Sequence, residues 1–538
     1  MGKLIALITA GLSFAAVFFS PGTCLYEIDA ADCGEKVGNK VSNVNIWEMG
    51  RSFYEPQNSE KNDIFDFVEY VQLMQCTGGN LERDLFRNPQ DSSVTDDYDF
   101  ERLVRNCRGI IASGAKPTLK LGNVPVKYSK NCKTGGFGVN ILPPDDYDVY
   151  YDYIHALAET LVDEFGKEEV LSWHFCVFTE YENADWFMCE NPDDSAEEFC
   201  KIYDYTAAAL CDAIGDVYIG AHSMSVTEGL WDEGIFIKHC AVGRNFKTGE
   251  TGSPLKFLSA SYYEPCAGGR RSQKSLADTI GCLRSQAEKY GLELDYGVDE
   301  GRLLTGSAGS QSDELMSRTV GYTYQAAFDA RIYGIMMDND IDYFSMWSYK
   351  SDGLNRGNPT VSCHVARRVS EFADALRVKA KKIKGALRFG AEAKAFAAFD
   401  EAENTLHIMA YNYKNDIDYG GKVKFKFRIN APQFADGEVK ITRYLIDDGC
   451  NYFDDWVKDR EKYGITAQAF SWSPDCPNIG ASLIDRDARE LYYSSLEEKY
   501  AVCSELEPEV TAGVISGGEL TVESELGGNS VVFYEISQ

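Results

Sequence analysis

Two glutamates, 120 positions apart, stand at the ends of apolar runs that predict β-strands. Glu180 closes the run 171–180, and Glu300 closes the run 294–300. If both runs are parallel strands of one barrel, their carboxyl ends open into a single pocket, so both side chains can reach one substrate. Two facing carboxyl groups can divide the work of acid/base and nucleophile on a glycosidic bond. This pair is the strongest indication of chemistry in the chain.

Each glutamate has acidic neighbours that compete for the same role. Glu182 and Glu190 follow Glu180 in an acidic aromatic loop, and Asp299 precedes Glu300. Because side chains alternate along a strand, we expect only one of Asp299 and Glu300 to point inward, and the sequence leaves open which one. Exposed carboxylates are common in loops, so the prediction depends on the position at a strand end.

Eight short apolar runs alternate with amphipathic helical stretches between residues 40 and 378. The predicted strands span 44–47, 70–76, 116–122, 171–180, 217–223, 257–264, 294–300 and 341–349. The predicted helices span 99–114, 147–166, 195–214, 272–290, 312–338 and 365–376. This alternation predicts an α/β fold, a parallel (β/α)8 TIM barrel. An open doubly wound sheet is the alternative, but no glycine-rich phosphate motif follows the first strand.

The pattern changes after about residue 380, where alternating strands follow one another. They are predicted at 393–399, 406–413, 422–429, 439–446, 520–522 and 530–536, with turn residues between them. This predicts a C-terminal antiparallel β-sandwich domain. A long acidic insertion at about 447–499 interrupts it. We therefore expect a catalytic barrel at 24–380 and a sandwich domain at 381–538.

The composition excludes some partners and favours others. The formal net charge is -31 and the pI is near 4.6. Such a surface repels nucleic acid and anionic membranes, so we expect neither as a partner. Six scattered histidines and the absence of any CxxC pair predict no metal site, and we expect no cofactor. The oligomeric state is not predicted.

The N-terminus predicts export. Lys3 precedes an apolar run at 4–19 that is too short for a good membrane span and is typical of a signal peptide, with cleavage near Gly22 or Thr23. An uncleaved N-terminal anchor is the alternative. We therefore expect a secreted or cell-surface protein, and the absence of an Asn-x-Ser/Thr acceptor favours a bacterial source. Export permits disulfides among the 16 cysteines, whose pairing the sequence does not specify.

Several segments match one family in order and spacing. They are VSNVNIW at 41–47, MQCTGG at 74–79, KPTLKLG at 116–122, WHFCVFTE at 173–180 and YLIDDGCNYFDDW at 444–456. With them the chain resembles glycoside hydrolase family 39, which includes β-xylosidases and α-L-iduronidases within the clan of retaining (β/α)8 glycosidases. The resemblance runs from about residue 41 to the C-terminus.

The resemblance implies roles for particular residues. Glu180 takes the position of the family's acid/base, and Glu300 takes the position of its nucleophile. Trp347 falls where the clan has an aromatic floor to the sugar subsite. Tyr262 or Tyr263 falls where the family has a tyrosine near the nucleophile. Each of these aromatic residues could equally belong to the core.

Four positions depart from the family's pattern and leave the identity of the sugar open. Thr179 stands where the clan has asparagine, and Tyr181 where it has proline. Ser261 stands at the position of the family's histidine, and Asp299 at that of its threonine. The asparagine normally hydrogen-bonds the sugar 2-hydroxyl, a contact that Thr179 would make more weakly or through water.

The resemblance predicts a secreted retaining exo-glycosidase that removes terminal residues of oligosaccharides or polysaccharides by double displacement. β-Xylosidase-like activity follows from the family, and α-L-arabinofuranosidase-like activity follows from the altered 2-hydroxyl contact. Iduronidase activity is less expected, because no basic cluster is evident. One alternative is a non-catalytic sugar-binding protein, motivated by the four departures. Another is a transglycosylase, favoured if aromatic residues such as Trp186 line an acceptor subsite.

Overall fold

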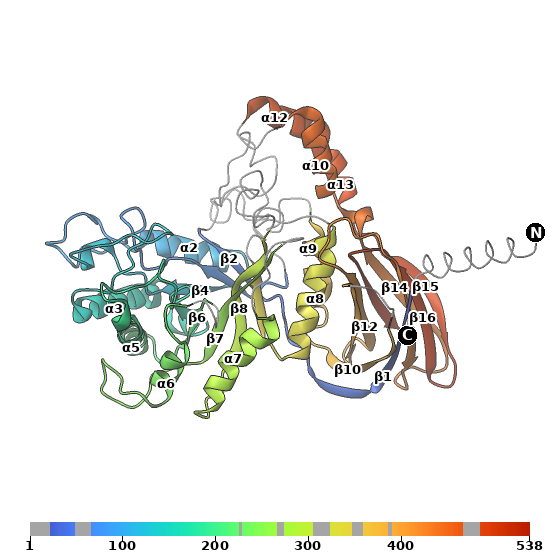
Figure 1. Cartoon of the computed structure of the whole chain (residues 1–538), viewed down its shortest axis with the longest axis horizontal. Helices are drawn as coiled ribbons and strands as arrows, with labels where there is room; N and C mark the ends of the chain where they lie inside the picture. Colours follow the sequence, from blue (N-terminus) through green and yellow to red (C-terminus); the bar gives the residue numbers. More distant parts are fainter. Residues whose placement is uncertain are drawn as a thin grey trace, which may run out of the picture.

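The structure of the protein is a computed structural model that describes residues 22–48, 66–224, 229–265, 274–304, 323–346, 359–385, 390–465 and 485–538. An α/β barrel and a β domain lie next to each other (Figure 1). Within these ranges no helix is both long and apolar enough to cross a membrane. The predicted signal peptide at 1–23 lies outside the described residues except for its last two positions.

Eight parallel strands close into the barrel. They are β2 (Asn43–Ile46), β3 (Tyr70–Leu73), β4 (Lys116–Leu121), β5 (His174–Val177), β6 (Tyr218–Ser223), β7 (Phe257–Pro265), β8 (Asp295–Leu304) and β9 (Tyr343–Met346). Each pairs with the next, and β2 pairs with β9 to complete the ring. Every strand overlaps a predicted run, so the barrel prediction is confirmed.

Helices surround the strands, and several begin and end where the sequence indicates. They are α2 (Glu101–Ala112), α3 (Tyr147–Phe165), α4 (Lys167–Leu171), α5 (Ser195–Ala213), α6 (Gly234–Val242), α7 (Leu276–Glu288), α8 (Tyr324–Asp338) and α9 (Val361–Ser370). The Asp146 side chain accepts from the first backbone N–H groups of α3, and Gly166, with φ of 86°, ends that helix. The sequence analysis missed α6, a short, mostly apolar helix.

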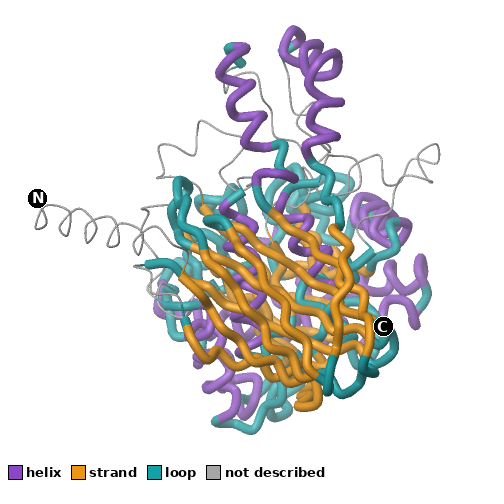
Figure 2. Tube along the Cα trace, turned by 90° about the vertical axis from the view of Figure 1, so that its right-hand side faces the viewer, coloured by secondary structure: helices purple, strands orange, loops and turns teal. Residues whose placement is uncertain are grey.

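The β domain is one nine-stranded sheet folded onto itself. Its strands are β1 (Gly22–Lys36), β10 (Leu376–Lys384), β11 (Glu392–Asp400), β12 (Thr405–Tyr413), β13 (Val423–Asn430), β14 (Gly437–Ile446), β15 (Glu509–Ile515), β16 (Glu519–Leu526) and β17 (Ser530–Ser537). Their order is β15-β14-β17-β12-β11-β10-β1-β13-β16 (strands in orange, Figure 2). Phe427 on β13 lies 6.3 Å or less from rings of both Tyr26 and Tyr534, although four strands separate β13 from β17 in the sheet. Only folding of the sheet brings these rings into one core.

The domain boundary differs from the prediction at the N-terminal side. The predicted barrel began at residue 24, but β1 belongs to the β domain, where it pairs antiparallel with β10 and parallel with β13. The barrel begins only with β2. Alternate β1 residues are buried in the core of the β domain, including Cys24, Tyr26 and Ile28. Neighbouring sequence does not reveal this assignment, because the partner strands lie more than 300 residues away in the chain.

Helices occupy the described parts of the segment between β14 and β15, where the acidic insertion was predicted. They include α10 (Phe453–Tyr463), α12 (Arg486–Leu491) and α13 (Glu497–Cys503), at the top of Figure 1. Hydrogen bonds anchor this segment to the barrel helices. Asn451 Nδ2 donates to Thr323 Oγ1 over 2.7 Å, and His364 Nε2 lies 2.7 Å from the Ser504 carbonyl oxygen.

The barrel and the β domain share a continuous core. Phe396, Met409 and Tyr411, on β11 and β12, pack into the same cluster as residues of α8 and α9. Arg331 on α8 pairs with Glu264 at the end of β7 and with Glu392 on β11, over 2.9 and 3.1 Å. The sheet therefore packs against the helices on one side of the barrel and does not form an independent module.

Candidate active site

Glu180 lies just beyond β5, where the backbone turns sharply. The strand ends at Val177, and both Phe178 and Glu180 have positive φ, at 64° and 47°. The turn brings the Phe178 ring against Gly122, where an added Cβ would lie 2.5 Å from the ring. Non-glycine residues in this conformation are uncommon and are held by their surroundings. The turn explains why β5 is shorter than the predicted strand 171–180.

Glu300 lies on β8 next to a β-bulge. Val298 pairs with Ala260 of β7, whereas Glu300 already pairs with Ser261, so Asp299 is an extra residue in the ladder. A bulge breaks the strict alternation of side chains. Asp299 and Glu300 are both buried, at 1% and 8% exposure, and both contact side chains from other strands of the barrel. The expectation that only one of them points inward is therefore wrong.

The two glutamates meet around Ser261. The Ser261 hydroxyl donates to Glu180 Oε1 over 2.7 Å, and the Ser261 backbone is the direct neighbour of Glu300 in the sheet. Asn183 Nδ2 donates to Glu180 Oε2 over 2.7 Å, and the Tyr263 hydroxyl donates to Glu300 Oε1 over 2.6 Å. Each carboxyl group is thus held by its own donors at one end of the barrel.

Burial is the main cause of a raised pKa at Glu180, and the nearby charge of Glu300 adds to it. Hydrogen bonds from Ser261 and Asn183 and the charge of Lys120 act in the opposite direction, and the resulting pKa is about 7. A carboxyl group with this pKa carries a proton in a large fraction of molecules near neutral pH. It can therefore act as a general acid there.

Asp299 lies in the barrel interior, where its carboxylate forms an ion pair and accepts a hydrogen bond. Its Oδ2 lies 3.0 Å from Lys120 Nζ, and its Oδ1 accepts from the Tyr343 hydroxyl over 2.5 Å. Burial alone would raise the Asp299 pKa, but the charge of Lys120 and the hydrogen bonds from Lys120 and Tyr343 hold it well below its usual range. The structure places this predicted substrate-binding residue inside the barrel, with its charge neutralised by Lys120.

The rival acids of the loop are placed differently from Glu180. Glu182 is fully buried, and its carboxyl oxygens accept from the Ser223 hydroxyl and the Met224 backbone N–H. Burial raises its pKa to about 8. Glu190 is exposed, 3.3 Å from Asn131 Nδ2. Of the three, only Glu180 accepts a hydrogen bond from Ser261 on β7, the residue that pairs with Glu300 in the sheet.

The remaining predicted site residues lie in different surroundings. Thr179 is buried beside Glu180, at 3% exposure. Tyr262 points elsewhere, because its hydroxyl donates to Glu264 Oε1 over 2.5 Å. Trp186 is buried, and its ring stacks at 4.6 Å on that of Phe137, which is 47% exposed. Trp347 lies outside the described residues.

Three residues near this end of the barrel were not predicted. Lys120 and His222 are fully buried in the barrel interior, and Phe137 is an exposed aromatic residue that could offer a platform to a sugar ring. A signal for Lys120 was available, because a charge inside the apolar run 116–122 has to find a partner when the strand is buried. No such signal marked His222.

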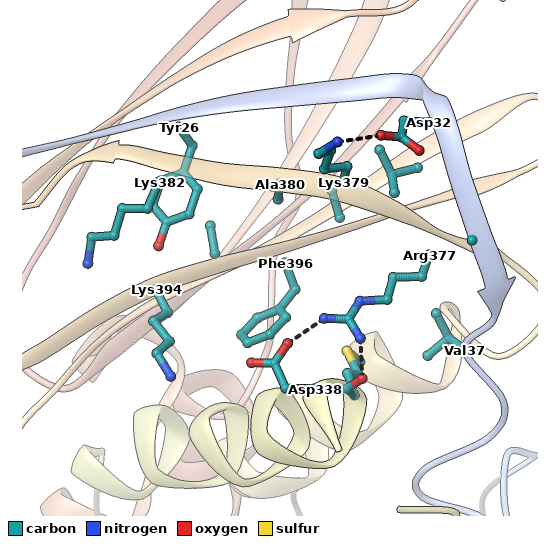
Figure 3. Close-up of a pocket in the computed structure, with 15 residues that line it drawn as sticks. Tyr26, Asp32, Val37, Asp338, Arg377, Lys379, Ala380, Lys382, Lys394 and Phe396 are labelled. Atoms are coloured by element: carbon teal, nitrogen blue, oxygen red, sulfur yellow. Dashed lines mark hydrogen bonds and ion pairs between the residues drawn. The ribbon is translucent and has the colours of Figure 1, made fainter. Parts of the chain in front are cut away.

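A cavity of about 570 Å³ lies elsewhere, at the junction of the two domains. Figure 3 shows it between β1, β10, β11 and the end of α8, with Arg377 paired to Asp338 and Lys379 paired to Asp32. Its lining contains neither Glu180 nor Glu300. Since its cations are largely paired with the protein's own acids, we do not assign the chemistry to it.

One group in the described part of the chain has the spacing of metal ligands: Glu371, His407 and Glu535. Arg368 forms ion pairs with both of its carboxylates. The guanidinium group therefore already supplies the positive charge that a metal would bring, and we assign no metal to the group.

Comparison with known proteins finds a family match over part of the chain. Residues 69–295, which include Glu180, match the model of Glycosyl hydrolases family 39. A β-xylosidase of Caldicellulosiruptor saccharolyticus is 27% identical over 242 residues, 45% of this chain and 46% of that protein. A β-xylosidase of Geobacillus stearothermophilus is 24% identical over 174 residues, 32% of each. The matched segments thus span less than half the length of these curated relatives.

Solved structures share the whole fold. A monomeric β-xylosidase from Caulobacter crescentus superposes with a TM-score of 0.66 at 16% identity, covering 95% of this chain and 99% of that one. A bacterial orthologue of human α-L-iduronidase superposes with a TM-score of 0.65 at 11% identity, covering 96% and 84%. At such identities the likeness concerns the fold, and the sequence matches carry the family resemblance: residues 69–295 of this chain match glycoside hydrolase family 39.

Proposed function

We propose that the protein is a glycoside hydrolase that cleaves terminal glycosidic bonds with retention of anomeric configuration. The observation that carries the proposal is the arrangement of Glu180 and Glu300 at one end of the barrel, brought together around Ser261. The family match supports the same class of reaction, because the curated relatives are named β-xylosidases.

In the first step, the Glu300 carboxylate attacks the anomeric carbon and the glycosidic bond breaks. Tyr263 orients Glu300 through its hydrogen bond to Oε1. Glu180 donates its proton to the departing oxygen. A pKa of about 7 keeps a large fraction of Glu180 protonated for this donation near neutral pH.

In the second step, water attacks the glycosyl ester at Glu300, and Glu180 accepts the proton from that water. Esterification removes the negative charge of Glu300, which is one cause of the raised pKa of Glu180. The pKa of Glu180 then falls, so the same group becomes a base after acting as an acid. The two donors to Glu180, Ser261 and Asn183, further stabilise its ionised form in this step.

A xylose-type sugar is the first candidate for the glycone, supported by the names of the two curated relatives. An α-L-arabinofuranosyl residue is the second, because buried Thr179 replaces the asparagine that would bind a 2-hydroxyl. The stacked pair of Trp186 and Phe137 could hold a second sugar unit. We therefore propose short oligosaccharides or polysaccharide ends as substrates.

We also propose that the protein is exported, as the apolar run at 4–19 indicates. Cleavage near Gly22 or Thr23 would leave nearly all of β1 in place, so the mature chain would keep its β domain intact. Expression of the full gene in a bacterial host, followed by N-terminal sequencing of the protein in the medium or periplasm, tests this. Retention of the protein in the cytoplasm would overturn export, whereas an exported protein with an uncleaved N-terminus would indicate the anchor instead of the signal peptide.

The test of the reaction is cleavage of a panel of aryl glycosides. The panel contains β-D-xyloside, α-L-arabinofuranoside, β-D-glucoside, β-D-galactoside and α-L-iduronide, and proton NMR identifies the anomer released first. Release of the retained anomer from one glycoside supports the proposal and names the sugar. First release of the inverted anomer would contradict it, as would no cleavage of the panel or of xylan-derived oligosaccharides. Oligosaccharide binding without cleavage would favour the non-catalytic alternative, and transfer to an added sugar would favour a transglycosylase.

A further inference from the structure

A buried polar chain lies beneath Glu180, and the reaction described above uses only its last member, Ser261. Lys120 Nζ lies 2.5 Å from His222 Nδ1, and His222 Nε2 lies 2.8 Å from Ser261 Oγ. Ser261 in turn donates to Glu180 Oε1. The links come from three strands, β4, β6 and β7, and the side chains of Lys120 and His222 are almost completely excluded from solvent.

The chemistry of the groups fixes the direction of every hydrogen bond in this chain. An ammonium group only donates, so His222 Nδ1 accepts from Lys120. Burial, together with the charge of Lys120, lowers the pKa of His222 far below its ordinary value, so the ring is neutral and carries its one proton on Nε2. His222 Nε2 therefore donates to Ser261 Oγ, which leaves the Ser261 hydrogen for Glu180.

Asp299 fixes the position of Lys120, the first donor of this hydrogen-bonded series. Its carboxylate pairs with Lys120. Burial acts to lower the Lys120 pKa, but Asp299, together with Cys176 and Glu300, raises it above its ordinary value. The Asp299 carboxylate is itself fixed by Tyr343 and by the Cys176 thiol, which lies 3.4 Å from Oδ2. The lysine thus remains charged inside the barrel and cannot accept a hydrogen bond from His222.

We propose that Lys120, His222 and Ser261 form a one-way donor chain that orients the Glu180 carboxyl group and sets its affinity for a proton. These three are positioning residues, because in the proposed reaction they act on the substrate only through Glu180. The proposal deepens the proposed function and rests on it only for the role of Glu180.

The donor chain orients the Glu180 carboxyl group together with Asn183. Oε1 accepts from Ser261 and Oε2 accepts from Asn183, so each oxygen has a donor of its own. The Ser261 donor also stabilises the ionised form, against the opposing effects of burial and of Glu300. Lys120 and Asp299, on β4 and β8, form an ion pair in which their charges largely neutralise one another. Loss of the Ser261 donor should therefore raise the proton affinity of Glu180.

The test is a direct titration of Glu180 that requires no catalysis. Protein labelled with carbon-13 at the glutamate side-chain carboxyl is titrated by NMR, and the signal missing from Glu180→Gln identifies Glu180. Ser261→Ala should raise the midpoint by about one pH unit, the typical effect of one lost hydrogen bond to a carboxylate. His222→Leu should shift it in the same direction, whereas His222→Gln, whose amide can accept from Lys120 and donate to Ser261, should keep the natural midpoint.

Ser259→Ala is the matched control. Ser259 is buried two positions earlier on β7, and its hydroxyl makes only a 3.5 Å contact with the Ala221 carbonyl oxygen. It should leave the midpoint unchanged. A midpoint that does not rise in Ser261→Ala would overturn the donor chain, as would equal shifts in His222→Gln and His222→Leu or in Ser259→Ala.

A second readout separates this proposal from the proposed function. If an aryl glycoside is cleaved, the alkaline limb of the pH profile of kcat/KM should move in the same order as the NMR midpoints. Absence of cleavage with the expected midpoints would refute the reaction and leave the donor chain standing. Cleavage with unmoved midpoints would refute the donor chain and leave the reaction standing.

Discussion

At the scale of single residues, the site depends on one carboxyl group with two different requirements. In the proposed reaction, Glu180 has to hold a proton before the leaving group departs and to release it before water attacks. A group with an ordinary glutamate pKa would be mostly ionised at neutral pH and would make a poor acid. Burial and Glu300 raise the pKa of Glu180 to about 7, and esterification of Glu300 would reverse part of that rise.

Substitutions of the two glutamates should have different signatures. Glu300→Gln should abolish turnover of every substrate, because the amide cannot form the glycosyl ester. Glu180→Ala should slow substrates with poor leaving groups by about 10²–10⁴-fold, the usual contribution of a general acid, and should spare the first step of aryl glycosides with good leaving groups. Steady-state rates on paired substrates check both, and added azide should restore turnover of Glu180→Ala. Equal losses on all substrates would remove Glu180 from the acid role.

At the scale of elements, β8 positions Glu300, the proposed nucleophile, through a bulge and a glycine. Gly301 follows Glu300, and an added Cβ would lie 2.4 Å from the Tyr262 carbonyl oxygen and 2.7 Å from the Phe344 ring. One contact is backbone, which cannot move without disturbing β7. The close approach of the two strands therefore requires glycine at this position.

Gly301→Ala should displace Glu300 and destabilise the barrel. We expect a loss of about 1–3 kcal/mol, the usual cost of overpacking, together with a fall in kcat. Thermal unfolding and steady-state kinetics check this. Gly281→Ala is the control, since this position of α7 has nothing within 4 Å of an added Cβ and alanine favours a helix. Natural activity and stability in Gly301→Ala would contradict this account of the strand pairing.

The other unexpected element is β1, which inserts between β10 and β13. Ile28 is 1% exposed in the core of the β domain, whereas the adjacent Glu27 side chain is 51% exposed. Ile28→Ala should destabilise the protein by about 2–5 kcal/mol, whereas Glu27→Ala should change stability by less than about 1 kcal/mol. Chemical denaturation of both variants checks the difference. Equal stabilities would mean that β1 is not part of the folded core.

At the scale of the whole molecule, buried carboxyl groups couple stability to pH. Burial raises the pKa of Glu182 to about 8 from an ordinary 4.5, and that of Asp84 to about 6. A raised folded-state pKa contributes stability below the unfolded pKa and loses it as the pH rises toward the folded value. Glu180 acts in the same direction. The net charge of -31 adds self-repulsion as more carboxyls ionise.

Stability should therefore fall between about pH 5 and pH 8. Glu182→Gln should flatten part of this fall, because the amide oxygen can accept from the Met224 N–H while the amide group donates to Ser223. Melting temperatures measured across this range check the prediction, with Glu190→Gln as an exposed control from the same loop. A larger fall in Glu182→Gln than in the natural chain would contradict it.

The sequence alone specified the barrel, most of the β domain and the two strand ends that carry Glu180 and Glu300. These features rest on local patterns, since the alternation of apolar residues reports burial and strand ends determine which residues meet at a barrel mouth. Asp299 and Glu300 could not be separated in this way. Their arrangement depends on a bulge, which arises from the pairing of β7 with β8 rather than from the composition of either strand.

Only the tertiary structure decided the contacts between distant parts of the chain. Lys120 and Asp299 lie on different strands, and the sequence around either residue does not predict the ion pair between them. His222 donates from Nε2 only because the Lys120 ammonium group, which belongs to that ion pair, donates to its Nδ1. The assignment of β1 to the β domain has the same origin. Local sequence determines which side chains must be buried, but partners across a closed barrel or a folded sheet are chosen by the packing of the whole chain.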